Sequence, residues 1–254
     1  MINLYFVGTA GSGKTTLTHA FQLWMQQHGF NAITMNLDPG VDMLPYPADI
    51  DVREWVSLPE VMQLYGVGPN GAQIIAADLL AVKAKEIKEV LEEFEADYLL
   101  VDTPGQMELF TLRESSRFVL DVFDSKKSAI AFLFDPVLAR MPAGFVSLLL
   151  LCTSTQFRFD IPIFNVLAKS DILSPEEVEK IVEWSKDSGK LYDALINTKP
   201  TMQTQASVEL FHALERIEAY KSLIAISSKN NYGMEDLYNL VQQVFAGGED
   251  LGKD

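Results

Sequence analysis

The segment GTAGSGKT occupies residues 8–15 and directly follows an apolar run from Ile2 to Val7. It has the pattern G-x-x-x-x-G-K-[ST], in which glycines let the backbone curl until several N–H groups point at a phosphate. The lysine supplies a mobile cation, and the threonine hydroxyl is a hard oxygen ligand suited to Mg²⁺. A glycine turn between a strand and a helix is the alternative, but the apolar run before the segment favours a nucleotide-binding loop.

This loop predicts the phosphate-binding residues directly. A helix that starts near Gly13 would add the positive end of its dipole to the site. Lys14 is also expected to assist phosphoryl transfer, and Thr15 is expected to ligate Mg²⁺. The expected nucleotide-binding residues here are Gly8, Gly11, Ser12, Gly13, Lys14, Thr15 and Thr16.

Composition limits the class of protein. The chain has 254 residues, 48% of them hydrophobic, which suits one large α/β domain. Its 20 basic and 35 acidic residues give a formal charge of −15, so we expect no direct nucleic-acid partner and no membrane. With Cys152 as the single cysteine and no basic-flanked signal segment, a cytoplasmic location is expected. The densest apolar stretch, Phe145–Cys152, is too short to span a bilayer.

Six apolar runs are predicted to be strands. They are Ile2–Val7, Ala32–Leu37, Asp97–Val101, Ala129–Phe134, Ile161–Leu167 and Leu223–Ile226. Helical patterns alternate with them, including Lys14–Gln27 and a helix opened by a capping box at Ser174–Glu177. The alternation predicts an α/β fold with a doubly wound, mainly parallel sheet of the P-loop NTPase type. We expect one domain over 1–254, with helical insertions at about 42–94 and 174–220 and a tail after Gly247.

Two acidic segments follow predicted strands. Asp102 ends one strand, and an aspartate in this position can hold Mg²⁺ through water. Gly105 can present its N–H to a γ-phosphate, and Gln106 can position a water. Asp38 ends the strand reached directly from the phosphate loop, where it could orient or deprotonate an attacking water. Strand-ending turns are the alternative interpretation of Asp38 and Asp102, and a solvated polar side chain is the alternative for Gln106.

The ends of the last two predicted strands suggest a base-reading site. The sequence AKSD at 168–171 matches the guanine motif N-K-x-D at Lys169 and Asp171, although Ala168 replaces the asparagine. An aspartate there accepts two hydrogen bonds from guanine, which adenine cannot offer. Ser227 and Ser228 match the loop whose backbone N–H meets the guanine O6. These residues favour guanine over adenine.

The motifs together resemble the GPN-loop GTPases, especially the archaeal members. The resemblance covers nearly the whole chain: GTAGSGKT at 8–15, LDP at 37–39, GPN at 68–70, DTPGQ at 102–106, AKSD at 168–171 and SSK at 227–229. By composition alone the Gly68–Asn70 segment is a turn. The resemblance implies instead that this loop, and Asn70 in particular, reaches the nucleotide of the other subunit in a dimer.

The sequence therefore predicts a Mg²⁺-dependent GTPase that hydrolyses GTP to GDP. It is expected to act as a homodimeric switch or assembly factor for an unidentified client protein. Lys14, Asp38, Gln106 and Asn70 are its expected catalytic residues. A P-loop kinase remains an alternative, separable by product analysis, as does a scaffold that binds GDP without turnover.

Overall fold

Seven strands form one sheet in the computed structural model, which describes residues 1–199, 201–217, 219 and 222–247. The strands are β1 (Ile2–Gly8), β2 (Ala32–Asn36), β3 (Ile50–Asp51), β4 (Tyr98–Asp102), β5 (Ser128–Phe134), β6 (Ile163–Leu167) and β7 (Leu223–Ala225). Their order is β3-β2-β4-β1-β5-β6-β7, and every neighbouring pair is parallel. The predicted doubly wound parallel sheet is confirmed, and six of these strands coincide with the six predicted runs.

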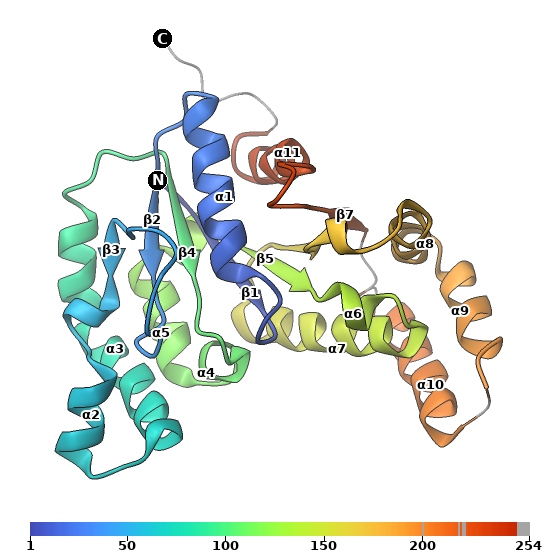
Figure 1. Cartoon of the computed structure of the whole chain (residues 1–254), viewed down its shortest axis with the longest axis horizontal. Coiled ribbons are helices and arrows are strands. Elements are labelled where there is room, and N and C mark those ends of the chain that lie inside the picture. The colour runs from blue at the N-terminus through green and yellow to red at the C-terminus, as the bar shows by residue number, and fades with distance from the viewer. Residues whose placement is uncertain (200, 218, 220–221, 248–254) are drawn as a thin grey trace.

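Helices cover both faces of the sheet (Figure 1). They are α1 (Lys14–Gln27), α2 (Leu58–Tyr65), α3 (Pro69–Leu91), α4 (Met107–Thr111), α5 (Glu114–Val122), α6 (Pro136–Ala139), α7 (Pro142–Phe159), α8 (Pro175–Lys186), α9 (Ser188–Ile196), α10 (Met202–Arg216) and α11 (Met234–Phe245). Short 3₁₀ turns occupy Val52–Glu54, Ser125–Lys127 and Ser170–Ile172. None of the helices in the described ranges is both long and apolar enough to cross a bilayer.

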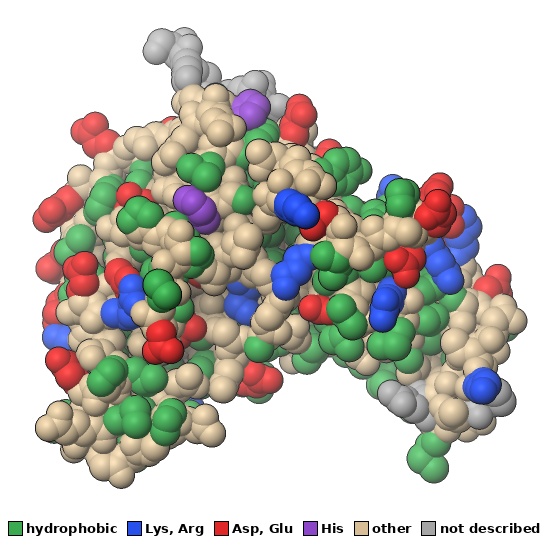
Figure 2. Space-filling model, in the orientation of Figure 1, with side chains coloured by type: hydrophobic (Ala, Val, Ile, Leu, Met, Phe, Trp, Pro, Cys, Tyr) green, Lys and Arg blue, Asp and Glu red, His purple; other side chains and the backbone are tan. Residues whose placement is uncertain are grey.

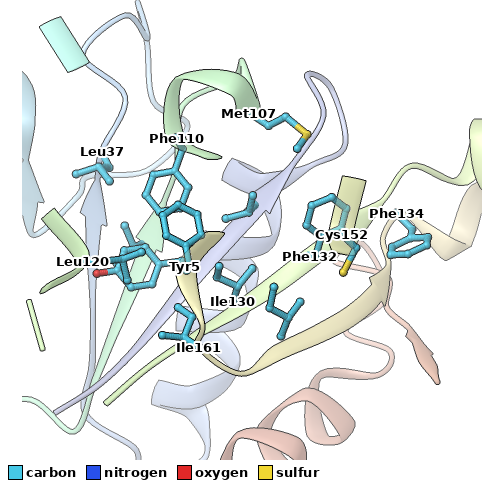
Figure 3. Packing of buried hydrophobic residues seen from close by; sticks show 14 of the residues in the cluster. Tyr5, Leu37, Met107, Phe110, Leu120, Ile130, Phe132, Phe134, Cys152 and Ile161 are labelled. Atoms are coloured by element: carbon cyan, nitrogen blue, oxygen red, sulfur yellow. The ribbon is translucent and has the colours of Figure 1, made fainter. Parts of the chain in front are cut away.

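Two layers of buried side chains attach these helices to the sheet. Along β1, Leu4 and Phe6 belong to the layer under α1 and α11, while Tyr5 and Val7 belong to the layer under α3, α4, α5 and α7. This alternation follows from the two-residue period of a strand. In the larger layer the rings of Tyr5 and Phe110 stack with their centroids 5.7 Å apart (Figure 3). Every residue of β1 is buried, as expected for a central parallel strand.

The two predicted insertions lie at opposite ends of the sheet (Figure 1). The first contains α2 and α3, but it also contains β3, which pairs with β2, so this insertion is not helical throughout. The second contains α8, α9 and α10, and α8 begins with the predicted capping box, in which the Glu177 N–H donates to Ser174 Oγ. Residues 200, 218 and 220 of this insertion, and the tail predicted beyond Gly247, lie outside the described residues.

The carboxyl ends of the strands meet at one edge of the sheet. Phe6 of β1 and Asn36 of β2 both pair in register with Asp102 of β4, so the loops after these three strands are neighbours. In open parallel sheets, ligands bind at this edge where the strand order reverses. On the face shown in Figure 2, most lysine and arginine side chains lie from the middle toward α8 and α9, with acidic side chains dense on the α3 side.

Candidate nucleotide site

The phosphate loop joins β1 to α1 as predicted. β1 ends at Gly8 and α1 begins at Lys14, with Gly13 as the residue before the first helical turn. Gly13 has φ 101°, a left-handed conformation that L side chains rarely adopt. A Cβ at Gly13 would also lie 3.0 Å from the Cε atom of Lys169. The backbone conformation therefore favours glycine at this position, whereas the Lys169 side chain could shift to make room for a Cβ.

Lys14 lies at the centre of the site. Its side chain is buried, and its ammonium donates to the carbonyl oxygens of Gly8 at 2.9 Å, Thr9 at 3.0 Å and Gly105 at 3.3 Å. Burial lowers the pKa of Lys14, although the nearby carboxylates of Asp102, Asp38 and Glu108 act in the opposite direction. A cation that is held by carbonyl oxygens and shielded from water is well placed to meet a phosphate group.

Asp102 ends β4 beside Thr15 and is 2% exposed. Burial raises its pKa to about 6, although the Thr15 hydroxyl and the Lys14 ammonium favour the charged form. Within the described residues, its Oδ1 atom is buried without a hydrogen-bond partner, and its Oδ2 atom accepts from the Tyr46 hydroxyl at 3.5 Å. A buried carboxylate oxygen without a partner next to a threonine hydroxyl is the donor set that a hard divalent cation such as Mg²⁺ prefers.

Asp38 and Gly105 are hydrogen-bonded to each other. The Gly105 N–H donates to Asp38 Oδ2 at 3.0 Å, and the Gly40 N–H donates to Asp38 Oδ1 at 2.8 Å. Asn36 fixes the turn from both sides, because its Oδ1 accepts from the Asp38 N–H and its Nδ2 donates to the Asp38 carbonyl. The segment after β2 and the segment after β4 are therefore joined directly at the site.

These residues surround a cavity of about 360 Å³. Its lining includes nine residues that were predicted from the sequence: Gly11, Gly13, Lys14, Thr15, Thr16, Asp38, Asp102, Gly105 and Lys169. It also includes three that were not predicted: Asn36, Val41 and Thr103. Ser12, which belongs to the phosphate loop, is fully buried, and its hydroxyl has no hydrogen-bond partner among the described residues.

A second cavity of about 160 Å³ continues from the first toward β6 and β7. The residues shared by both cavities are Gly13, Thr16 and Lys169. Asp171 and Ser228 line the second cavity, and the Lys169 ammonium donates to the Gly11 carbonyl at 2.5 Å.

The predicted base-reading aspartate is exposed at the rim of this cavity. Its Oδ1 accepts from the buried Ser227 hydroxyl at 2.7 Å, so two segments predicted to read the base are joined. Lys229, the last residue of the SSK motif, also lines this cavity. Ile172 lines it too and was not predicted, because a lone apolar residue carries no spacing signal.

Asn70 and Gln106 lie away from the phosphate cavity of their own chain. They line a separate hollow of about 430 Å³ together with Arg113, whose guanidinium pairs with Asp78 of α3 through Nη2–Oδ2 at 2.5 Å and Nε–Oδ1 at 3.0 Å. The turn expected from composition at Gly68–Asn70 is instead the start of α3, with Pro69 as its first residue. Asn70 is exposed there, in the first turn of a 23-residue helix.

Comparisons with known proteins find similarity over nearly the whole chain. A family model described as a conserved hypothetical ATP binding protein matches residues 6–247. A GPN-loop GTPase of Pyrococcus abyssi is 33% identical over 248 residues, covering 97% of this chain and 98% of the relative. GPN-loop GTPase 1 of Dictyostelium discoideum is 29% identical over 243 residues, covering 94% of this chain and 60% of the longer relative.

A solved structure is also similar. The crystal structure of a GTPase in apo form from Pyrococcus abyssi matches with a TM-score of 0.85 at 32% identity, covering 96% of this chain and 97% of that one. Its match over nearly the whole length of both chains extends the similarity beyond the nucleotide-binding motifs to the arrangement of the helices and strands.

Proposed function

This chain belongs to the GPN-loop GTPases, a family of GTP hydrolases, and on that premise we propose that it hydrolyses GTP to GDP and phosphate as a homodimer. The observation that carries the proposal is the convergence of Lys14, Thr15, Asp38, Asp102 and Gly105 on one cavity. A switch or assembly role toward a client protein would follow from a slow cycle between GTP- and GDP-bound forms.

Mg²⁺ fits the residues present. Thr15 and Asp102 would hold it, and the buried Asp102 Oδ1 atom offers an oxygen that no described protein group satisfies. When bound, Mg²⁺ would supply positive charge to offset that of the β- and γ-phosphates.

The chain's own residues would do the remaining work. Lys14 would transfer its hydrogen bonds from backbone carbonyls to phosphate oxygens. If the γ-phosphate takes the Gly105 N–H, Asp38 Oδ2 loses its partner and becomes an acceptor for the attacking water. Gln106, next along the chain, lines the neighbouring hollow in this structure and would have to turn toward the cavity to help place that water. One displacement would therefore create the group that orients the nucleophile.

Guanine recognition would fall to Asp171 and the loop at Ser227 and Ser228. The Asp171 carboxylate, which the Ser227 hydroxyl contacts, would accept hydrogen bonds from guanine. Lys169 bridges this site and the phosphate loop, because its ammonium donates to the Gly11 carbonyl. The matched family model is described as an ATP binding protein. We nevertheless propose GTP as the substrate, because the carboxylate of Asp171 favours a base that presents two hydrogen-bond donors to it, as guanine does and adenine does not.

Action of Asn70 in trans is part of the proposal. Its support is that Asn70 does not line its own phosphate cavity, yet it is exposed at the start of a long helix where its amide could enter a neighbour's site. A preorganised amide donor to a phosphate oxygen is worth on the order of 10²-fold in rate.

Multiple-turnover phosphate release, measured in parallel with GTP and ATP, tests the activity. We expect catalytic release from GTP that exceeds release from ATP. A single burst without turnover would favour a GDP-binding scaffold, and a phosphorylated acceptor in place of inorganic phosphate would favour a kinase.

A mixed dimer tests action in trans. Asn70→Ala chains are combined with Lys14→Ala chains, so that in a mixed dimer the chain able to bind GTP receives an intact Asn70 from its neighbour. Rescue of one of the two sites is expected. If mixed dimers are shown to form and GTP hydrolysis is still not rescued, the proposal of action in trans is wrong and Asn70 acts only within its own chain.

A further inference from the structure

Residues 41–49, here called the strap, connect the Asp38 turn to β3, and Val41 at the start of the strap lines the phosphate cavity. Arg53 holds one end, because its Nη1 donates to the Val41 carbonyl at 3.0 Å while its Nη2 pairs with Asp51 at 2.6 Å. Asp49 holds the other end, where its Oδ2 accepts from the Thr34 N–H at 2.7 Å and from Gln22 Nε2 at 3.0 Å. One end of the strap is therefore fixed to the turn after β3, and the other end is fixed to β2 and α1.

Between these anchors the strap directs one aromatic side chain inward. Tyr46 is 4% exposed, and its ring stacks on His19 of α1 with centroids 5.2 Å apart and planes 7° apart. Its hydroxyl donates to Asp102 Oδ2 at 3.5 Å. The phenol O–H is a neutral donor, which suits a carboxylate acceptor.

The two oxygens of Asp102 thus differ in their surroundings. Oδ2 is in contact with the phenol, whereas Oδ1 has no hydrogen-bond partner within the described part of the chain. A carboxylate that ligates a metal is commonly oriented by a hydrogen bond to one of its oxygens, and loss of such a partner typically costs 10- to 100-fold in metal affinity.

We propose that Tyr46 is a positioning residue that orients Asp102 for the divalent cation of the nucleotide site. Its hydroxyl engages Oδ2 and leaves Oδ1 for the metal, and the stack on His19 sets the plane of the phenol ring. This inference rests on the proposed Mg²⁺-dependent GTPase function and adds a residue that no motif in the sequence indicates.

The test is Tyr46→Phe, which removes the hydroxyl and keeps the ring and its stack. Tyr5→Phe is the matched control, because Tyr5 is as deeply buried but lies in the layer under α4. Two quantities are measured for each protein: the affinity for a fluorescent GDP in excess EDTA, and the affinity for Mn²⁺ in the presence of GDP, from the electron paramagnetic resonance signal of free Mn²⁺.

We expect Tyr46→Phe to weaken Mn²⁺ binding about tenfold. Its affinity for GDP in EDTA and its thermal midpoint should match those of the wild type, and Tyr5→Phe should leave Mn²⁺ binding unchanged. Equal losses of GDP affinity with and without metal would overturn the proposal by showing that the hydroxyl only supports the local fold. Unchanged Mn²⁺ affinity in Tyr46→Phe would also overturn it.

The wild-type measurement separates this inference from the function on which it rests. Wild-type protein that binds GDP with no dependence on a divalent cation would contradict the proposed Mg²⁺-dependent activity, and the role of Tyr46 with it. A wild-type dependence that Tyr46→Phe preserves would contradict the role of Tyr46 alone.

Discussion

At the scale of single residues, the site divides into positions fixed by local spacing and positions assembled by the fold. Lys14 and Thr15 could be assigned from the sequence because the eight-residue motif at 8–15 places both at the start of a helix. Tyr46 and Val41 could not, since they reach the site through a strap whose path depends on Arg53 and Asp49. A tertiary path of this kind leaves no periodic signal in the sequence.

Replacement of Lys14 by alanine should remove tight nucleotide binding without unfolding the protein. The ammonium is buried among three carbonyl oxygens, and its loss removes charge-assisted hydrogen bonds worth roughly 1.5–3 kcal/mol each to a phosphate. Calorimetry should show GTP affinity reduced by roughly 10²-fold or more. Lys127→Ala, which changes an exposed lysine of a 3₁₀ turn, is the control. Wild-type affinity in Lys14→Ala would contradict the assignment.

Asp102→Asn should stabilise the metal-free protein at alkaline pH. Burial raises the pKa of Asp102 from 3.8 to about 6, so between these values the folded state binds more protons than the unfolded state, and stability falls as pH rises through that window. Above about pH 6 the charged carboxylate therefore costs roughly 3 kcal/mol.

Urea denaturation in EDTA measures this effect. At pH 8 the free energy of unfolding of Asp102→Asn should exceed that of the wild type by up to roughly 3 kcal/mol, and near pH 4 the two values should converge. A variant less stable than the wild type at pH 8 would show that the carboxylate has stabilising partners that outweigh its burial.

At the scale of secondary-structure elements, the strands were more predictable than the helices between them. Central parallel strands are buried on both faces and read as continuous apolar runs. β3 escaped prediction because two residues form no pattern. α7 was not assigned because its stretch Phe145–Cys152 is apolar even at the exposed Leu151 and the half-buried Leu150, so the sequence shows no clear helical stripe although the folded helix has an exposed face.

The Gly-Pro-Asn segment illustrates an ambiguity of residue type. Pro and Asn favour turns, but Pro is also well suited to the first position of a helix, where its missing N–H has no intrahelical partner to lose. Here Pro69 begins α3 and Gly68 precedes it in extended conformation. Composition cannot separate the two outcomes, because the decision depends on how the helix packs against α5.

Gly233→Ala should destabilise the junction between β7 and α11. Gly233 has φ 75°, and a Cβ there would lie 2.1 Å from the Ala225 carbonyl oxygen, a backbone atom that cannot easily move. We expect a loss of roughly 2–4 kcal/mol in the free energy of unfolding. Gly247→Ala is the matched control: its φ is 65°, but nothing lies within 4 Å of the added Cβ, so its cost should stay near 1–2 kcal/mol. Equal costs would mean that backbone conformation alone decides both.

At the scale of the whole molecule, one sheet carries two insertions at its opposite ends (Figure 1). The sequence could predict both insertions from their length, but not the hollow that Asn70 and Gln106 share. That hollow exists because α3 packs on α5, with the Arg113–Asp78 pair between them, a contact across 35 residues. The arrangement places the start of α3 next to the segment that follows Asp102.

Homodimer formation should strengthen with ionic strength. Two chains of formal charge −15 repel each other, and salt screens this repulsion, with a Debye length of about 10 Å at 0.1 M. Sedimentation velocity of the protein with a non-hydrolysable GTP analogue should therefore show a lower dissociation constant at 300 mM than at 50 mM KCl. Weaker association at the higher concentration would indicate an interface held by ion pairs.

The hydrogen bond between Gly105 and Asp38 sets a limit on how strongly one chain can register its nucleotide. Any phosphate that takes the Gly105 N–H must first displace Asp38, so the coupling free energy at this contact is the difference between two charge-assisted bonds of roughly 1.5–3 kcal/mol each. The difference between two such bonds is at most about 1.5 kcal/mol, so through this contact one chain alone can favour a triphosphate over a diphosphate by no more than about tenfold. A sharper response requires further free energy from outside the chain, and the proposed second subunit would be a source of it.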